Sequence, residues 1–397
     1  MKHAPLLTVF CLAMLCSTGT MAQAAADTVR ARDLGIPFDG TPGPLNAITD
    51  VAGVQVGHST IVEDLDDGRT VRTGVTAILP RGRESFAKPV FAGGFSLNGN
   101  GEMTGTIWVE ESGMLEGPVM ITNTHSVGIV RDAVIQWRVQ QGGADASGYW
   151  WSLPVVAETW DGYLNDINGF HVKAEHAFAA LDAAAGGPVA EGGVGGGTGM
   201  ICHEFKGGIG TASRQIDGGY TLGVLVQANY GLRDQLRIAG APVGRHLQDH
   251  KVYTDPELAM TAPRPYAETG SIIIVVATDA PLLPHQLKRL TRRAAMGLAR
   301  MGSIASNGSG DIFIAFSTAN AQAGQAGPPV QVEMLSNEEM NGLFAATVQA
   351  TEESIVNALI AGRDMRGDSG HLVKAIPHDQ LREVLQRYNR LEPAGAE

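Results

Sequence analysis

Cysteine is nearly absent from this 397-residue sequence, which has only three. Cys11 and Cys16 lie near the N-terminus, in a segment with the pattern of a cleaved leader, so Cys202 alone would remain in the mature chain. Because a single cysteine cannot form an intramolecular disulfide, we expect the fold to be stabilised by packing even in an oxidising compartment.

Positive charge and long hydrophobic runs are also scarce. The chain has 29 Lys and Arg against 41 Asp and Glu, which gives a formal net charge of −12. Nucleic acids and anionic membranes recruit Lys and Arg, so this composition argues against both as partners. No segment reaches the roughly eighteen consecutive apolar residues of a transmembrane helix. The partner that the composition favours is small, and neutral or cationic.

The local motifs of several enzyme classes are missing. The sequence has no GxSxG element around a plausible serine, and it has no HExxH motif or pair of CxxC motifs that would bind zinc. The glycine-rich segment Gly192–Met200 (GGVGGGTGM) lacks the lysine of a phosphate-binding loop. We interpret it as a tight turn where backbones approach closely. No metal or organic cofactor is implied by these patterns.

The N-terminus has the pattern of an export signal. Lys2 supplies a positive charge, Leu6–Cys16 is largely apolar, and Ala22-Gln23-Ala24 has the small-x-small form that signal peptidase recognises. We predict that residues 1–24 are a signal peptide and that the mature chain is periplasmic. A membrane anchor is the alternative, but the apolar run would span only about half of a ~30 Å hydrocarbon layer.

Apolar runs alternate with helical patterns along the rest of the chain. The runs contain β-branched residues and are bounded by Gly, Asn or Asp, which predicts strands buried on both faces. These strands are expected at Val119–Thr122, Leu222–Ala228, Ile272–Thr278 and Ile312–Phe316. Helices are expected at Ile129–Gln140, His171–Ala185, Pro284–Met301, Glu338–Ala361 and His378–Leu391. The alternation predicts an α/β fold in which helices cover sheets.

Residues 236–270 break this alternation. The segment has four prolines and no sustained periodicity, and it ends at Gly270-Ser271, directly before an apolar strand. A long irregular connection inside a compact domain is usually functional or disordered. Glycine permits the strained backbone in which a following serine hydroxyl attacks the preceding carbonyl, so Gly270-Ser271 could be a self-cleavage site. On local sequence alone, a simple turn is the commoner interpretation.

Six segments together resemble the family of L-aminopeptidase D-Ala-esterase/amidases and β-peptidyl aminopeptidases, the DmpA-like N-terminal-serine hydrolases. The segments are Asn98–Thr106, Thr122–Gly128, Gly192–Arg214, Val226–Gly231, Thr269–Leu282 and Asn307–Thr318. They occur in family order over most of the mature chain. The resemblance implies an αββα sandwich made from one precursor, which cuts itself before Ser271 into associated subunits of residues 25–270 and 271–397.

The resemblance also implies roles for individual residues. Ser271 would be both the self-cleavage nucleophile and the N-terminal catalytic nucleophile. The freed α-amine has an ordinary pKa of about 7.7–8.0, so it can accept the hydroxyl proton near neutral pH. Ser309 and Asp311 match the family's second serine and acidic residue, and they would relay protons to Ser271. Some members carry Glu in place of this Asp, which leaves the details of the relay open. Asn229 would stabilise the oxyanion.

Two pocket residues follow from the same resemblance in a more variable region. Tyr163 is expected to hydrogen-bond near the scissile carbonyl, and Glu158 is expected to hold the free ammonium of the substrate. A buried structural pair in a strand-to-helix turn is the alternative interpretation of these two residues.

The function implied is that of an N-terminal-nucleophile serine aminopeptidase acting through an acyl-enzyme on Ser271. Its substrates would be small peptides, aminoacyl amides or esters, with D- or β-residues among the candidates, and several αβ units would associate. Two alternatives stay open at this point. A related fold carries out acetyl transfer with a freed threonine, and an uncut periplasmic ligand-binding protein would also fit the export signal.

Overall fold

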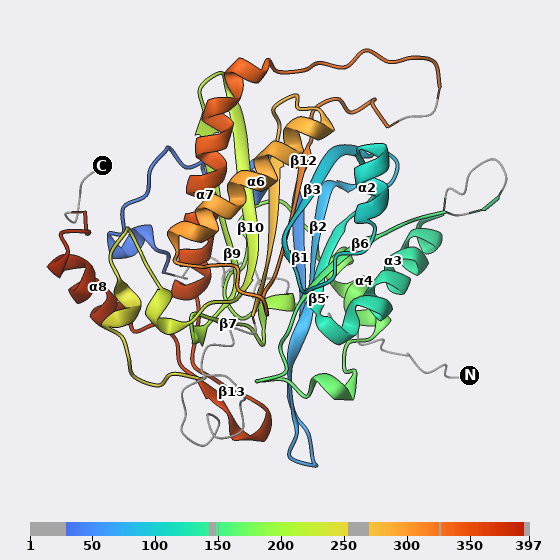
Figure 1. Cartoon of the computed structure of the whole chain (residues 1–397). Helices are drawn as coiled ribbons and strands as arrows, with labels where there is room; N and C mark the ends of the chain where they lie inside the picture. Colours follow the sequence, from blue (N-terminus) through green and yellow to red (C-terminus); the bar gives the residue numbers. More distant parts are fainter. Residues whose placement is uncertain (1–28, 143–147, 150, 253–269, 325–326, 393–397) are drawn as a thin grey trace, which may run out of the picture.

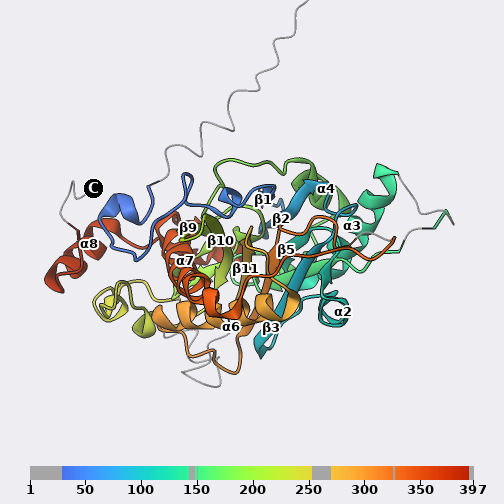
Figure 2. The same cartoon turned by 90° about the horizontal axis from the view of Figure 1, so that it is seen from above.

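The chain folds into four layers, with two β-sheets packed face to face and helices on both outer sides (Figures 1 and 2). This is the αββα sandwich that the resemblance implied. The computed structural model describes residues 29–142, 148–149, 151–252, 270–324 and 327–392. The predicted signal peptide 1–24 and residues 253–269 of the irregular connection lie outside the described residues.

The larger sheet has six strands in the order β4-β3-β12-β11-β10-β9. Its strands are β3 (Val90–Gly99), β4 (Met114–Leu115), β9 (Gly208–Ile216), β10 (Tyr220–Asn229), β11 (Ser271–Thr278) and β12 (Gly310–Ser317). Strand β11 pairs antiparallel with β10 and parallel with β12. Its outer face is covered by α6 (Pro284–Arg300) and α7 (Asn341–Ile360). The start of β11 therefore lies between two neighbouring strands in the middle of this sheet.

The smaller sheet has four strands in the order β1-β2-β5-β6. Its strands are β1 (Gln55–Asp64), β2 (Thr70–Arg83), β5 (Val119–Asn123) and β6 (Val155–Thr159). Helices α3 (Val127–Gln141) and α4 (Ala174–Asp182) cover its outer face. The remaining short elements are α2 (Thr106–Ser112), α8 (His378–Arg387) and the hairpins β7–β8 (Ile201–Cys202, Phe205–Lys206) and β13–β14 (Met365–Arg366, Leu372–Val373).

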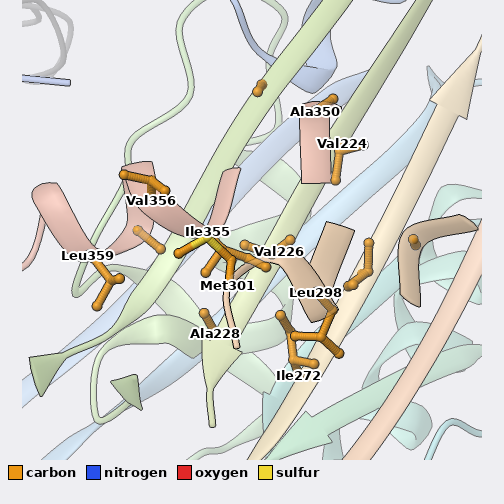
Figure 3. Close-up of a cluster of buried hydrophobic side chains, with 14 of the residues drawn as sticks. Val224, Val226, Ala228, Ile272, Leu298, Met301, Ala350, Ile355, Val356 and Leu359 are labelled. Atoms are coloured by element: carbon orange, nitrogen blue, oxygen red, sulfur yellow. The ribbon is translucent and has the colours of Figure 1, made fainter. Parts of the chain in front are cut away.

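Strand β11 shows why the central strands are apolar along their whole length. Ile272, Ile274 and Val276 pack toward the helices, whereas Ile273 and Val275 pack between the two sheets. Figure 3 shows the helix side, where Val226 and Ile272 lie near Leu298 and Met301 at the end of α6. Successive side chains of a strand point to opposite faces, so burial on both faces requires a continuous apolar run. The predicted burial is confirmed.

All four predicted strands and all five predicted helices are present, with shifted ends. Helix α4 begins at Ala174 and not at His171, because the residue before it, Lys173, has an extended backbone with φ of −122° and ψ of 171°. The predicted helix Glu338–Ala361 begins as a 3₁₀ turn at Asn337–Met340 and continues as α7. In the described part of the chain, no helix combines the length and apolar character needed to cross a membrane.

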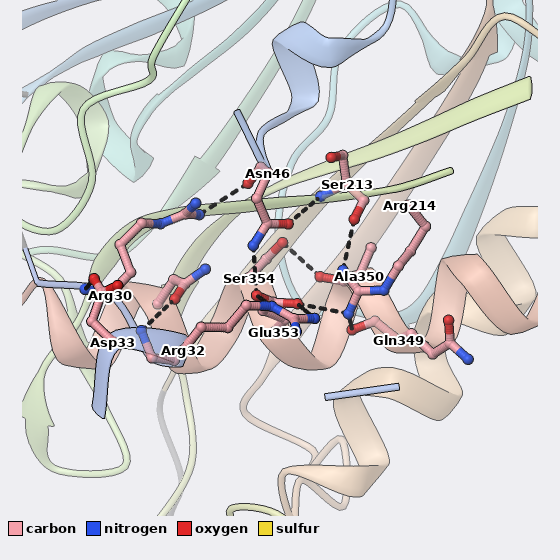
Figure 4. A network of polar contacts seen from close by, with 12 residues as sticks. Arg30, Arg32, Asp33, Asn46, Ser213, Arg214, Gln349, Ala350, Glu353 and Ser354 are labelled. Carbon is pink, nitrogen blue, oxygen red and sulfur yellow. Dashed lines mark hydrogen bonds and ion pairs between the residues drawn. The ribbon is translucent and has the colours of Figure 1, made fainter. Parts of the chain in front are cut away.

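A buried ion-pair network joins α7 to the N-terminal segment and to β9 (Figure 4). Glu353 accepts from Arg32 at 2.7 Å and from Arg214 at 2.6 Å, and Asn46 donates to the same carboxylate at 2.6 Å. Burial opposes ionisation of this carboxyl, but the hydrogen bond from Arg32 and the charge of Arg214 hold its pKa below the usual value. The network therefore links elements that lie before and after Gly270-Ser271 in the sequence.

Candidate active site

Ser271 is the first residue of β11, and its side chain is 5 % exposed. The strand register places Ser271 opposite Asn229, the last residue of β10, and opposite Gly310, the first residue of β12. Ser271 has the same parity as Ile273 and therefore faces the space between the sheets. Three chain segments that are distant in sequence thus meet around one serine hydroxyl.

Ser271 opens onto a cavity of about 600 Å³. The lining residues come from both sheets and from the loops that follow their strands: Asn100, Gly101, Glu102, Thr124, Glu158, Trp160, Ser271 and Gly308. Two of these residues are glutamates, and none is a lysine or an arginine. The lining therefore suits a small ligand that carries a positive charge close to the serine.

Glu158 lies on β6, in the smaller sheet, and is 3 % exposed. One carboxylate oxygen accepts from the backbone N–H of Glu102 at 3.0 Å, and the other accepts from the Thr124 hydroxyl. Burial raises the pKa of Glu158, although the hydrogen bonds from Thr124 and Glu102 oppose this effect. An incoming ammonium would supply the counter-charge that this buried carboxylate needs.

The Asn229 amide is fixed in one orientation by its two backbone partners. Its Oδ1 accepts from the N–H of Ile201 at 2.8 Å, and its Nδ2 donates to the carbonyl of Trp160 at 2.8 Å. Exchanging the oxygen and nitrogen would set donor against donor and acceptor against acceptor. An amide nitrogen has two hydrogens, so the second Nδ2–H is available next to Ser271.

The backbone around Gly270 is tightly packed and holds the carbonyl that precedes Ser271. The N–H of Gly310 points at both the Gly270 carbonyl oxygen, at 3.3 Å, and the Ser271 hydroxyl oxygen, at 3.2 Å. A Cβ at Gly270 would collide with the carbonyl oxygen of Asn229, so glycine is required there. This N–H donor is placed where negative charge would develop on the Gly270 carbonyl.

Ser309 and Asp311 form the pair that the sequence predicted. The Ser309 hydroxyl donates to Asp311 Oδ1 at 2.6 Å, and both residues are completely buried. Asp311 lies on β12 with the parity of Phe313, which packs toward the helices. Gly310, between the two residues, makes the direct contact with Ser271.

Tyr163 is not among the residues that line this cavity. Its ring stacks on His371 with centroids 4.1 Å apart, and its carbonyl accepts from the same imidazole at 2.8 Å. It packs against a small buried cluster that contains Leu164 and Val373. Its predicted contact with a scissile carbonyl stays a prediction.

Comparison with known proteins identifies the family. The model of peptidase family S58 matches residues 46–373. The chain belongs to peptidase family S58. It is 54 % identical over 385 residues to the β-peptidyl aminopeptidase BapA of Sphingosinicella microcystinivorans. This alignment covers 94 % of this chain and 95 % of that protein.

Solved structures agree with this assignment. A β-aminopeptidase from a Burkholderia species superposes with a TM-score of 0.81 at 49 % identity, covering 92 % of this chain and 100 % of the other. The L-aminopeptidase D-Ala-esterase/amidase of Ochrobactrum anthropi, described as a prototype serine aminopeptidase with a variant of the Ntn hydrolase fold, superposes at 0.83 with 50 % identity, covering 91 % and 99 %. This S58 chain is therefore a serine aminopeptidase with an Ntn hydrolase fold, and the binding-protein alternative is not supported.

Several residues at the cavity beside Ser271 had been given no role from the sequence. Glu102 and Thr124 hold Glu158, and Trp160 holds Asn229 through its carbonyl. Glu102 and Thr124 lie inside segments that carried the family resemblance, but the resemblance assigned no role to either residue. In the described part of the chain, no three His, Cys, Asp or Glu side chains gather as a metal site would require.

Asp161 follows Trp160 in the sequence and has an ionisable side chain that is buried. It is fully buried, and burial raises its pKa to about 6, although hydrogen bonds from Thr73 and Asn165 oppose the effect. Its unfolded value is near 3.8, so the ionised carboxylate destabilises the fold above about pH 6, and this penalty fades as the pH falls toward 4.

We expect Asp161→Asn to raise the free energy of unfolding at pH 8, because the amide resembles the protonated acid. The expected gain is about 2–3 kcal/mol at pH 8 and less than about 1 kcal/mol at pH 4. Urea unfolding at the two pH values measures this difference. An equal shift at both pH values would show that the effect comes from packing and not from ionisation.

Proposed function

We propose that this S58 aminopeptidase is an exported precursor that cuts itself between Gly270 and Ser271 and then releases N-terminal residues from small peptides, amides or esters. The observation that carries the proposal is the buried carboxylate of Glu158, which lines the same cavity as Ser271. A carboxylate beside the nucleophile would accept a free substrate ammonium and so limit cleavage to the first residue of a chain.

Self-cleavage would begin with attack of the Ser271 hydroxyl oxygen on the Gly270 carbonyl carbon. The bond between this carbon and the Ser271 nitrogen breaks, and the nitrogen takes up the hydroxyl proton. Water then hydrolyses the resulting ester, which leaves a carboxylate on Gly270 and a free amine and hydroxyl on Ser271. The N–H of Gly310, 3.3 Å from the Gly270 carbonyl oxygen, supports this step because it is placed to stabilise the developing negative charge.

Substrate hydrolysis would repeat this chemistry on an external carbonyl. The Ser271 oxygen attacks, the free α-amine or Ser309 takes its proton, and the same proton is returned to the departing amine or alcohol. Asn229 donates its remaining N–H to the oxyanion, and the hydrogen-bonded Ser309–Asp311 pair stabilises the protonated base. Water then hydrolyses the acyl-enzyme and regenerates Ser271.

The relatives guide the choice of substrates. The related proteins described as β-peptidyl aminopeptidases and L-aminopeptidase D-Ala-esterase/amidase support testing amides of β-amino acids beside amides of L- and D-amino acids. We further infer a periplasmic location from the N-terminal leader and an assembly of several αβ units from the family resemblance.

The role of Glu158 is tested by Glu158→Gln with a free and an N-acetylated aminoacyl p-nitroanilide. We expect kcat/KM for the free amine to fall roughly 10²–10³-fold, mainly through KM, because an amide cannot neutralise the ammonium. Wild-type kcat/KM should also fall as the pH decreases through the raised pKa of Glu158, since only the carboxylate binds the cation. The part of this acid limb that Glu158 causes should disappear in the variant, whereas the part that comes from protonation of the Ser271 α-amine should remain.

Glu191→Gln is the matched control, because Glu191 is also a buried glutamate but pairs with Arg30 away from the cavity. It should keep the wild-type kcat/KM for the free amine. Rapid wild-type hydrolysis of the N-acetylated substrate, or an unchanged KM in Glu158→Gln, would contradict the ammonium-binding role.

A further inference from the structure

One of the two backbone groups that orient the Asn229 amide belongs to the peptide unit between Met200 and Ile201. The N–H of this unit donates to Asn229 Oδ1 at 2.8 Å. The carbonyl of the same unit, on Met200, accepts from the ammonium of Lys206 at 3.0 Å. Lys206 is therefore connected to the Asn229 amide through one rigid peptide plane.

Lys206 is a charged residue in a fully buried position. It is completely buried, and its three N–H donors go to the backbone carbonyls of Gly197, at 3.2 Å, Met200, at 3.0 Å, and Gly207, at 2.8 Å. Burial lowers its pKa to about 7, and Cys202 partly offsets this effect. Burying an ammonium among neutral carbonyls is costly, so the presence of a lysine there calls for an explanation beyond packing.

The hairpin that carries Lys206 is fixed at its other end. Its turn residues, His203 and Glu204, both adopt left-handed backbone conformations, with φ of 48° and 61°. Buried Arg233 donates to the carbonyls of both residues, at 2.9 and 2.6 Å. The N–H of His203 donates to the carbonyl of Tyr230, the residue after Asn229, at 2.7 Å. With the turn held in this way, the Lys206 ammonium fixes the end of the hairpin nearest Asn229.

We propose that Lys206 is a positioning residue for hydrolysis, which orients and polarises the Asn229 amide through the Met200–Ile201 peptide. The inference rests on the oxyanion role of Asn229 in the proposed function. Lys206 is not among the residues that line the cavity beside Ser271, and its ammonium donates to the carbonyls of Gly197, Met200 and Gly207.

The physical basis is a chain of aligned hydrogen bonds that ends on a positive charge. The ammonium attracts electron density toward the Met200 oxygen, which makes the Ile201 N–H a stronger donor to Asn229 Oδ1. The Asn229 Nδ2–H in turn becomes a stronger donor toward an oxyanion. Without the ammonium, the Met200 carbonyl keeps the N–H of Gly207 as a partner at 2.9 Å, so the loop would keep its path but lose the charge.

The test compares Lys206→Met, which keeps the length of the side chain, with Lys206→Gln, which keeps a neutral donor. We expect kcat for an aminoacyl p-nitroanilide, per mole of cleaved chain, to fall about 10- to 100-fold in Lys206→Met and less in Lys206→Gln. KM should stay within about threefold of the wild-type value, because the ammonium-binding Glu158 is untouched. Lys206→Gln carries the test if Lys206→Met does not fold.

Gln286→Met is the matched control for the loss of a buried donor. The Gln286 side chain is buried at the start of α6 and donates to the carbonyl of Leu335 at 2.8 Å, remote from Asn229. It should lower the melting temperature and keep the wild-type kcat. A folded Lys206 variant with unchanged kcat, or one whose kcat and KM both change in proportion to lost stability, would overturn the inference.

Coupling to Asn229 separates this inference from the proposed function. In an Asn229→Ala background, Lys206→Met should lower kcat by less than about twofold, because the group through which it acts is gone. Suppose that Asn229→Ala lowers kcat and that Lys206→Met lowers kcat just as much in this background as in the wild type. Only the positioning role of Lys206 then fails. If Asn229→Ala keeps the wild-type kcat, the oxyanion role in the proposed function fails first.

Discussion

Replacing Ser271 by alanine is expected to leave one uncut chain and to abolish aminopeptidase activity. The hydroxyl is the atom that attacks both the Gly270 carbonyl and the substrate, and alanine offers no replacement. Loss of a catalytic serine lowers kcat by roughly 10⁶-fold in other serine hydrolases, so no hydrolysis of an aminoacyl p-nitroanilide should be detected. Denaturing electrophoresis and a progress curve measure the two effects on the same sample.

Ser317→Ala is the matched control for this variant. Ser317 is a completely buried serine at the opposite end of the β11–β12 pair, where its hydroxyl donates to the carbonyl of Ala280 at 2.6 Å. It should be cut and active. Cleavage at the normal position in Ser271→Ala, or wild-type kcat in that variant, would refute Ser271 as the nucleophile.

Asn229→Ala is expected to lower kcat for hydrolysis by about 10²–10³-fold and to change KM little. The amide N–H meets the substrate oxygen only when negative charge develops on it, so its loss affects the transition state more than substrate binding. Steady-state kinetics per mole of cleaved chain give both constants. A large rise in KM with unchanged kcat would assign Asn229 to substrate binding instead.

Asn357→Ala controls for the loss of a buried asparagine. Asn357 makes the same kind of contacts on α7, since its Oδ1 accepts from the N–H of Ala31 and its Nδ2 donates to the carbonyl of Thr211, both at 3.0 Å. This variant should lose stability and keep kcat. A comparable fall in its kcat would show that loss of stability alone explains the Asn229 effect.

The central strands and the covering helices could be predicted from the sequence because burial sets their patterns. Strand β11 is apolar on both faces, and α6 repeats apolar residues every three or four positions. Strands β1, β2, β3 and β9 were not predicted, since Gly, Thr, Ser and Arg interrupt them. In β9, for example, buried Arg214 is acceptable only because Glu353 of α7 neutralises it, and that partner is distant in sequence.

In the site as well, contacts between residues close in sequence were easier to predict than contacts between distant segments. The Ser309–Asp311 hydrogen bond joins residues only two positions apart, and the family resemblance had paired them. The approach of Glu158 to Ser271 depends on how the smaller sheet packs against the larger one, which only the family resemblance could imply. The Lys206 connection was missed because it runs through the peptide between Met200 and Ile201, and side-chain patterns carry no information about backbone groups.

Self-cleavage before Ser271 is the central claim, and intact-mass analysis with N-terminal sequencing of the purified protein tests it most directly. The account predicts two chains of about 26 and about 13 kDa, if mass follows length, and a light chain that begins Ser271-Ile272-Ile273. The heavy chain should begin at Ala25 if the leader is removed as predicted. A single chain of about 39 kDa that nevertheless hydrolyses aminoacyl amides at full rate would contradict the account.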